Sequence, residues 1–261
     1  DNLIYDERPV VTNHNDDVVA DTKPTEAITI SSSGQFLKNW ILPSANDFIK
    51  DPAKHHQRPV GNPGLDFPFV QSNFNDENWD PVNLPHDWAI NQPFYTGPNP
   101  EVGGGMGRLP SHGVAWYRKK LNITSAEKGK SIYIEIDGAM SYAMVWLNGK
   151  LVGGWPYGYN SFQLDLTPYI NFGGVNQLAI RLDNPPNSSR WYPGGGIYRN
   201  VWLLKVRPLH VAQWGTFIRA RNISASSATI DLDVNIENNS AQDQTVEVVT
   251  NIFALDASFK K

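Results

Sequence analysis

Short segments in which apolar and polar residues alternate fill the stretch between residues 114 and 206, and this pattern limits the fold more than any other feature. The segments are 114–123, 132–137, 142–147, 150–152, 161–166, 177–183 and 200–206. None of this region carries a helical stripe of ten or more residues. Short strands at a spacing of about 8–15 residues are typical of antiparallel sandwiches. We therefore predict an all-β protein whose first unit is a jelly-roll β-sandwich, similar to a galactose-binding domain.

The sequence of this region predicts one tight hairpin. Asn148-Gly149 stands between two apolar runs, 142–147 and 150–152. Both residues of a two-residue hairpin turn need a positive φ, which Asn and Gly tolerate best. The sequence predicts that these two runs pair as antiparallel strands.

A second unit is expected from Pro208 onward. Apolar residues alternate with polar ones in 228–237 and again in 246–252, as in strands with one wet face. The unit is about half as long as the ~100 residues of an immunoglobulin-like sandwich. We therefore expect a truncated immunoglobulin-like sandwich over 208–261, cut from a longer protein.

The region that precedes the predicted strands lacks their sustained alternating pattern. Residues 1–28 are polar and aperiodic and are interpreted as a lead-in without a fold of its own. The jelly-roll domain is assigned to 29–207, with a possible first strand at 36–42. The span 43–74 contains five prolines and little pattern, so we predict a long surface excursion there.

Composition limits the partners and the location. The net charge is only −4 and no Lys- or Arg-rich run occurs, so nucleic acid and anionic membranes are not expected partners. No stretch approaches 18 apolar residues, so no membrane span is predicted. The sequence contains no cysteine, and this absence does not fix the compartment. It begins at Asp1 without a methionine, which is consistent with a cleaved leader or a trimmed chain. We expect a periplasmic or secreted protein.

Catalytic signatures are missing from the sequence. It contains no Gly-x-Ser-x-Gly elbow and no His-Glu-x-x-His pair. Glu135 and Asp137 face the same side of one predicted strand at roughly 6–7 Å, within the separation that a pair of glycosidase carboxylates needs, yet nothing provides an apolar pocket to raise the pKa of either. We interpret them as a solvated strand face, and expect no catalytic residue and no cofactor here.

The run 189–200 is the best candidate for ligand recognition. Arg190, Trp191 and Tyr192 precede a proline and three consecutive glycines, which allow sharp turns or close approach of another backbone. Sugar rings offer flat CH faces ringed by hydroxyls, so an aromatic loop on a rigid sheet suits sugar binding. The alternative is a tight turn whose aromatic side chains cap the core.

An ordered set of motifs resembles glycoside hydrolase family 2, the β-galactosidase and β-glucuronidase group. The motifs are Phe-Asn-Asp-Glu-Asn-Trp through Leu-Pro-His-Asp-Trp at 74–90, Trp-Tyr-Arg-Lys at 116–119, Ile-Asp-Gly-Ala at 136–139, Val-Trp-Leu-Asn-Gly at 145–149, and Gly-Ile-Tyr-Arg-Asn-Val-Trp-Leu at 196–203. The resemblance covers about residues 34–207. The segment 210–215 resembles the start of the family's immunoglobulin-like second domain.

The resemblance implies a function for the whole protein and a smaller one for this chain. In the family this domain is a sugar-binding jelly roll, and the two catalytic glutamates lie on a later TIM barrel. By implication the parent is a retaining exo-β-glycosidase, with β-galactosidase favoured. Its partners would be a β-linked glycoside and a C-terminal TIM-barrel domain outside these residues.

The resemblance also assigns site residues. Arg190, Trp191 and Tyr192 are expected to contact the sugar, with Arg190 as a donor to hydroxyls. Some relatives have a sodium-binding aspartate here; Ser189 and Arg190 stand in its place, so no metal is expected. Asp87 is expected near the same site, with a turn-fixing hydrogen bond as its alternative role.

Two other classes of function fit the same pattern. A free-standing carbohydrate-binding module or lectin has the same sandwich and aromatic loop. A purely structural adhesion sandwich has the strands without any glycan site.

Overall fold

The computed structural model describes residues 50–54, 61–62, 64–98, 109, 111, 113–184, 194–258 and 260. The chain divides into two compact units, Asp1–Lys205 and Val206–Lys261. This division falls two residues before the predicted start of the second domain. The predicted lead-in and the possible first strand at 36–42 lie outside the described residues.

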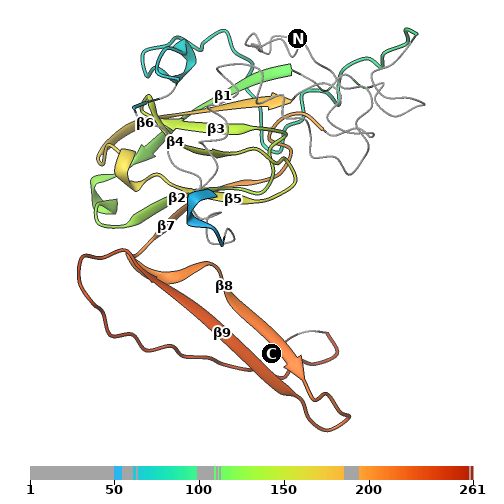
Figure 1. The fold of residues 1–261 in the computed structure, drawn as a ribbon, viewed down its shortest axis with the longest axis vertical. Coiled ribbons are helices and arrows are strands. Elements are labelled where there is room, and N and C mark those ends of the chain that lie inside the picture. The colour runs from blue at the N-terminus through green and yellow to red at the C-terminus, as the bar shows by residue number, and fades with distance from the viewer. Residues whose placement is uncertain are drawn as a thin grey trace. The chain divides into compact units, whose positions relative to one another are not determined.

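The first unit contains two sheets packed in layers (Figure 1). The four-stranded sheet has the order β1 (Gly113–Ile123), β6 (Gly174–Asn184), β3 (Ala143–Leu147) and β4 (Lys150–Trp155). The three-stranded sheet has the order β5 (Phe162–Asp165), β2 (Ser131–Ile136) and β7 (Val201–Val206). The pairs β1–β6, β3–β6, β3–β4 and β2–β5 are antiparallel. The predicted all-β sandwich is confirmed.

Helical structure in the described residues is limited to short 3-10 turns. These are η3 (Pro52–Lys54), η4 (Pro68–Val70), η5 (Ser125–Glu127) and η6 (Thr167–Tyr169). Within that part of the chain, no helix is long and apolar enough to cross a membrane.

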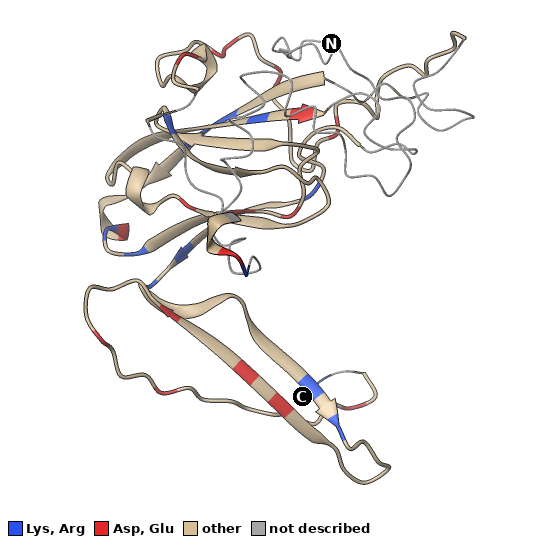
Figure 2. Cartoon of the chain, viewed as in Figure 1, with Lys and Arg blue, Asp and Glu red and all other residues tan. Residues whose placement is uncertain are grey.

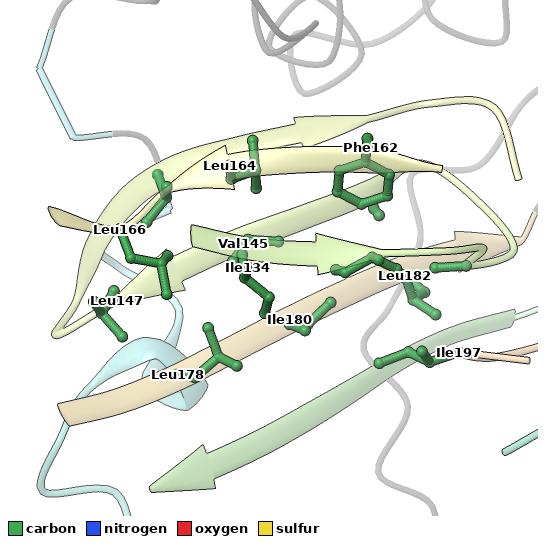
Figure 3. Packing of buried hydrophobic residues seen from close by; sticks show 14 of the residues in the cluster. Ile134, Val145, Leu147, Phe162, Leu164, Leu166, Leu178, Ile180, Leu182 and Ile197 are labelled. Atoms are coloured by element: carbon green, nitrogen blue, oxygen red, sulfur yellow. The ribbon is translucent and has the colours of Figure 1, made fainter. Parts of the chain in front are cut away.

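The main core fills the space between the two sheets. Ile132, Ile134 and Ile136 of β2 are at most 2% exposed, as their period-2 spacing predicts. Figure 3 shows side chains from β5, β3 and β6 directed toward the same interior. Each buried Ile or Leu contributes about 1.5–3 kcal/mol of transfer free energy. The alternation seen in the sequence is therefore the pattern that builds this core.

The predicted hairpin between β3 and β4 is confirmed. Asn148 and Gly149 have φ values of 53° and 74°, the left-handed region that this turn requires. The Asn148 side chain also donates to the Tyr169 carbonyl oxygen and to Asn176 Oδ1, both at 2.8 Å. The turn residue thus joins the hairpin to η6 and to the start of β6.

The prediction of a surface excursion over 43–74 is wrong for its described part from residue 64. Val70 is fully buried, and Phe67 and Phe69 pack against the ring of Trp116, at 5.3 and 5.2 Å between centroids. Trp116 and Trp146 lie on the face of the four-stranded sheet that does not belong to the main core. Aromatic residues that lie between the prolines cover this second face. The high proline content of the span favoured a surface segment over a packed one, and the prediction was therefore wrong.

A buried arginine holds this cover in place. The side chain of Arg118, on β1, is only 2% exposed. Its Nε donates to Asp76 Oδ2 at 2.7 Å, and its Nη1 donates to the carbonyl oxygens of Phe69 and, at 3.1 Å, Gln71. Several backbone acceptors of the cover therefore depend on one guanidinium group.

The second unit contains a long antiparallel ribbon of β8 (Leu209–Arg221) and β9 (Thr229–Asn238). Figure 2 shows basic residues near the end of β8 and acidic residues along β9. Arg219 Nη2 donates to Asp231 Oδ2 at 3.1 Å, and Arg221 Nη2 donates to Asp231 Oδ1 at 2.6 Å. The Arg221 hydrogen bond also holds the pKa of Asp231 below its ordinary value.

The strand predicted over 246–252 is wrong: the structure gives these residues no strand. In the second unit, the described strands β8 and β9 pair only with each other. An extended segment becomes a strand only when a neighbour satisfies its backbone donors and acceptors. The alternating pattern is present in 246–252, but this segment pairs with none of the described strands.

Replacing Arg118 by methionine should destabilise the first unit by about 2–4 kcal/mol, because buried acceptors lose their charged donor. Urea unfolding followed by tryptophan fluorescence measures the change. Lys120→Met, an exposed position on the same strand, is the control and should change stability by less than about 0.5 kcal/mol. Equal effects of the two substitutions would contradict the role given to Arg118.

Candidate functional site

Asp87 lies in an extended segment that runs beside residues from far along the chain. His86 N donates to the Ile197 carbonyl oxygen at 2.8 Å, and Trp88 N donates to that of Gly195 at 2.9 Å. Asp87 is thereby held beside residues 194–197, which we call the glycine segment. These residues directly follow the predicted sugar-contacting run.

The glycine segment is paired on its other side as well. Met140 N donates to the Gly196 carbonyl oxygen at 2.9 Å, and Gly196 N donates back to Met140 at 3.3 Å. The segment therefore lies between the strip 86–88 and the turn that follows β2. Its position is fixed from both sides by backbone hydrogen bonds.

The sequence predicted that these glycines permit close approach, and the structure confirms it. Gly196 has φ 113°, and a Cβ atom there would lie 2.5 Å from the His86 carbonyl oxygen and 2.7 Å from the Tyr117 hydroxyl. A Cβ on Gly195 would lie 2.8 Å from the Trp88 ring. A side chain at either position would push the strip 86–88 away.

The Asp87 carboxylate is half-buried and has one clear structural role. Its Oδ1 accepts a hydrogen bond from Ala89 N at 2.8 Å. This is the turn-fixing bond considered as the alternative role of Asp87. Its Oδ2 lies near Gly194, since a Cβ built on that glycine would be 3.6 Å away. The sugar-binding role of Asp87 stays a prediction.

The other three predicted site residues, Arg190, Trp191 and Tyr192, lie outside the described residues. Both anchors of that run are described. Asn184, fully buried at the end of β6, donates through Nδ2 to the Gly194 carbonyl oxygen at 2.8 Å and to that of Ser111 at 2.7 Å. The chain thus leaves the sheet at Asn184 and returns next to it.

Sequence reasoning missed Asn184, because nothing in the sequence distinguishes it from other strand-end asparagines. It also missed the pairing of His86 with Tyr117, whose hydroxyl lies 2.8 Å from His86 Nδ1. Burial lowers the pKa of His86, and the nearby Asp87 carboxylate partly opposes this change. A neutral imidazole therefore stands next to the candidate site at neutral pH.

The two strand carboxylates considered for catalysis have structural partners. Glu135 accepts from Gln163 Nε2 at 3.1 Å, and Asp137 accepts from Trp202 Nε1 at 3.1 Å. Across the described part of the chain, no three His, Asp or Glu side chains gather as a metal site.

The profile of "Glycosyl hydrolases family 2, sugar binding domain" matches residues 69–207, which contain Asp87, the glycine segment and both sheets. The chain belongs to glycoside hydrolase family 2. The predicted family is confirmed, and the match includes the whole candidate site.

Relatives in the family include two named activities. A β-galactosidase of Bacteroides ovatus is 44% identical over 185 residues, which cover 70% of this chain and 21% of the relative. A β-glucuronidase of Formosa agariphila is 30% identical over 231 residues, which cover 77% of this chain and 23% of the relative. The chain therefore spans about a fifth of the length of these family 2 proteins.

Solved family 2 structures agree with the fold. A β-glycosidase from Bacteroides vulgatus superimposes with a TM-score of 0.61 at 36% identity, over 70% of this chain and 23% of that one. A family 2 member from Bacteroides cellulosilyticus gives 0.60 at 34% identity, over 64% and 22%.

The pKa of His86 predicts a pH dependence of stability. Because the folded-state pKa is below the unfolded value of about 6.5, protonation favours the unfolded state as the pH falls below that value. We expect the His86 Hε1 resonance to titrate with a midpoint below 6.5. His86→Gln identifies the resonance by its absence, and should reduce the loss of urea stability between about pH 7.5 and about pH 5.5. A midpoint at or above 6.5 contradicts the assignment.

Proposed function

We propose that this chain is the N-terminal, non-catalytic part of a retaining exo-β-glycosidase of family 2, and that the whole protein is a β-galactosidase. The observation that supports this best is the position of Asp87 beside Gly194, where the predicted sugar-contacting run rejoins the sheet. A carboxylate and a loop with arginine and aromatic residues provide an acceptor, a donor and a stacking face. These are the groups that a galactosyl unit needs at the wall of a pocket.

The catalytic groups belong, in this proposal, to a TIM-barrel domain outside these residues. Arg190 donates to sugar hydroxyls, Trp191 or Tyr192 stacks on the ring or on the barrel, and Asp87 accepts from a hydroxyl. The chain's part in catalysis is then to hold the glycoside in one orientation. A periplasmic or secreted location is part of the same proposal.

The second unit supports a longer parent protein. Large apolar side chains are solvent-exposed along β8 and in the segment that follows β9, including Phe217 at 57%, Ile218 at 64% and Ile252 at 78%. Exposed apolar surface of this kind favours burial against more polypeptide. We propose that it is the first part of an immunoglobulin-like sandwich.

The choice of galactoside over glucuronide follows the relative with the higher identity of the two named above, which is a β-galactosidase. Comparison of nitrophenyl β-galactoside with nitrophenyl β-glucuronide as substrates of the full-length protein tests it directly. Turnover of the glucuronide alone would replace galactoside by glucuronide in the proposal.

In the full-length protein, Asp87→Asn should lower kcat/KM for nitrophenyl β-galactoside about tenfold, because an amide keeps the Oδ1 acceptor but loses the charge. Arg190→Ala should lower it by at least the same factor. Asp165→Asn is a matched control, since Asp165 Oδ1 also accepts from the N–H two residues later, at 2.9 Å, and it should leave kcat/KM unchanged. Wild-type values of kcat/KM in both Asp87→Asn and Arg190→Ala would contradict the placement of these residues in the pocket.

Titration calorimetry of residues 1–261 with galactose separates the proposal from its alternatives. A half-pocket without its barrel should bind at millimolar affinity or weaker. Micromolar, saturable binding would instead indicate a free-standing carbohydrate-binding module or lectin. An adhesion sandwich would have no glycan affinity, and the full-length protein would not hydrolyse glycosides.

A further inference from the structure

The turn between β4 and β5 carries exposed aromatic side chains on a rigid backbone. We call residues 156–161 the tyrosine turn. Tyr157 is 55% exposed and Tyr159 is 38% exposed, although both belong to a domain with a well-filled core. Their rings pack edge to face, with centroids 5.4 Å apart and an interplanar angle of 64°. The two rings therefore form a corner rather than a flat stack.

Several contacts fix the backbone that presents this corner. Tyr142 N donates to the Pro156 carbonyl oxygen at 2.9 Å, and Ser161 Oγ donates to that of Asp137 at 3.2 Å. Gly158 is buried, and a Cβ there would lie 2.4 Å from Met140 Sδ, so the turn is pressed against Met140. Tyr157 and Tyr159 flank Gly158, so they project from a backbone whose position is fixed by these contacts. Little conformational entropy is lost when such a surface binds a ligand.

Polar groups of the two residues that directly follow the glycine segment, Tyr198 and Arg199, complete the cluster. The Tyr198 hydroxyl donates to the Gly158 carbonyl oxygen at 2.8 Å. Burial raises the pKa of Tyr198, the Arg199 charge opposes this, and Tyr159 and Tyr157 add to the rise, so all four groups lie within electrostatic reach. Arg199 is exposed, and it has no hydrogen bond or ion pair to any described residue. The cluster thus combines two accessible ring surfaces with an available guanidinium donor.

We propose that the tyrosine turn, together with Tyr198 and Arg199, binds a pyranose unit of a β-linked oligosaccharide. One tyrosine ring takes the CH face of the sugar, the second ring closes the corner, and Arg199 donates to ring hydroxyls or to a uronate carboxylate. The exposed large apolar residues of the second unit are mainly aliphatic, as expected of surfaces that pack on protein. The proposal rests on the carbohydrate recognition proposed above.

This site is separate from the one that contains Asp87. The strip 86–88 pairs with the glycine segment on one side, and Met140, which supports the tyrosine turn, pairs with it on the other. A glycan chain held here would be retained by contacts other than those proposed for Asp87. The tyrosine turn would then hold polymeric substrates near the enzyme.

Affinity electrophoresis of the full-length protein in gels containing soluble β-1,4-galactan, xyloglucan or mixed-linkage β-glucan tests the site. At least one polysaccharide should retard the wild type. Tyr157→Ala and Tyr159→Ala should each weaken the retardation about tenfold, because each removes one stacking ring. A tenfold loss of affinity corresponds to roughly 1.4 kcal/mol of binding free energy. Tyr157→Phe keeps the ring and should stay close to wild type. Phe94→Ala, which removes another exposed ring of the same domain, is the matched control and should have no effect.

The outcomes separate this inference from the proposed function. Asp87→Asn and saturation of the pocket with isopropyl β-thiogalactoside should leave retardation unchanged while hydrolysis falls. Retardation that those two treatments abolish belongs to the pocket and overturns the second site. The inference also fails if no gel retards the wild type, or if the Tyr157 and Tyr159 variants migrate as wild type. A drop in thermal stability of these variants without glycan binding would give the rings a packing role and overturn the second site.

Discussion

Burial of apolar side chains between the two sheets is the constraint on which the rest of the first unit depends. The three isoleucines of β2 are almost inaccessible to solvent. They share the core with Leu164 of the neighbouring strand β5 and with the leucines and isoleucine of β6, which belongs to the opposite sheet. Because every second residue of each strand must face this core, the register of every strand is fixed. The ends of the strands, and the turns that leave them, are then fixed as well.

The glycine segment connects the two proposed sites to this rigid sandwich. Backbone hydrogen bonds join it to the strip 86–88 and to Met140, so residues more than a hundred positions apart in the sequence share one narrow ladder. Only glycine fits between the His86 carbonyl oxygen and the Tyr117 hydroxyl at position 196. The same ladder supports Asp87 on one side and the tyrosine turn on the other. Each of the two proposed sites therefore has a scaffold that does not need a ligand to form.

Individual elements show which parts of the structure could be predicted from the sequence. The hairpin at Asn148-Gly149 was predictable because its turn chemistry is local, and β2 was predictable because its alternation is strict. The aromatic cover around Phe67 and Phe69 was not, since its partners Trp116 and Trp146 are distant in the sequence. The segment 246–252 shows the opposite error: a strand was predicted from its alternating residues, but it pairs with none of the described strands. Strand pairing is a property of two segments, and periodicity reports only one.

The sequence by itself determined the all-β class, most strand positions, the sharp turn or close approach that the glycines at 194–196 permit, and the family, because these depend on local periodicity, turn chemistry and ordered motifs. Only the tertiary structure decided that Asp87 lies beside Gly194, that Asn184 holds the return of the chain, and that the tyrosine turn is pinned to Met140. Those contacts join different segments of the chain, and the contact of Asp87 with Gly194 spans more than a hundred positions. Their geometry is set by how the two sheets pack, and no local pattern in the sequence encodes it.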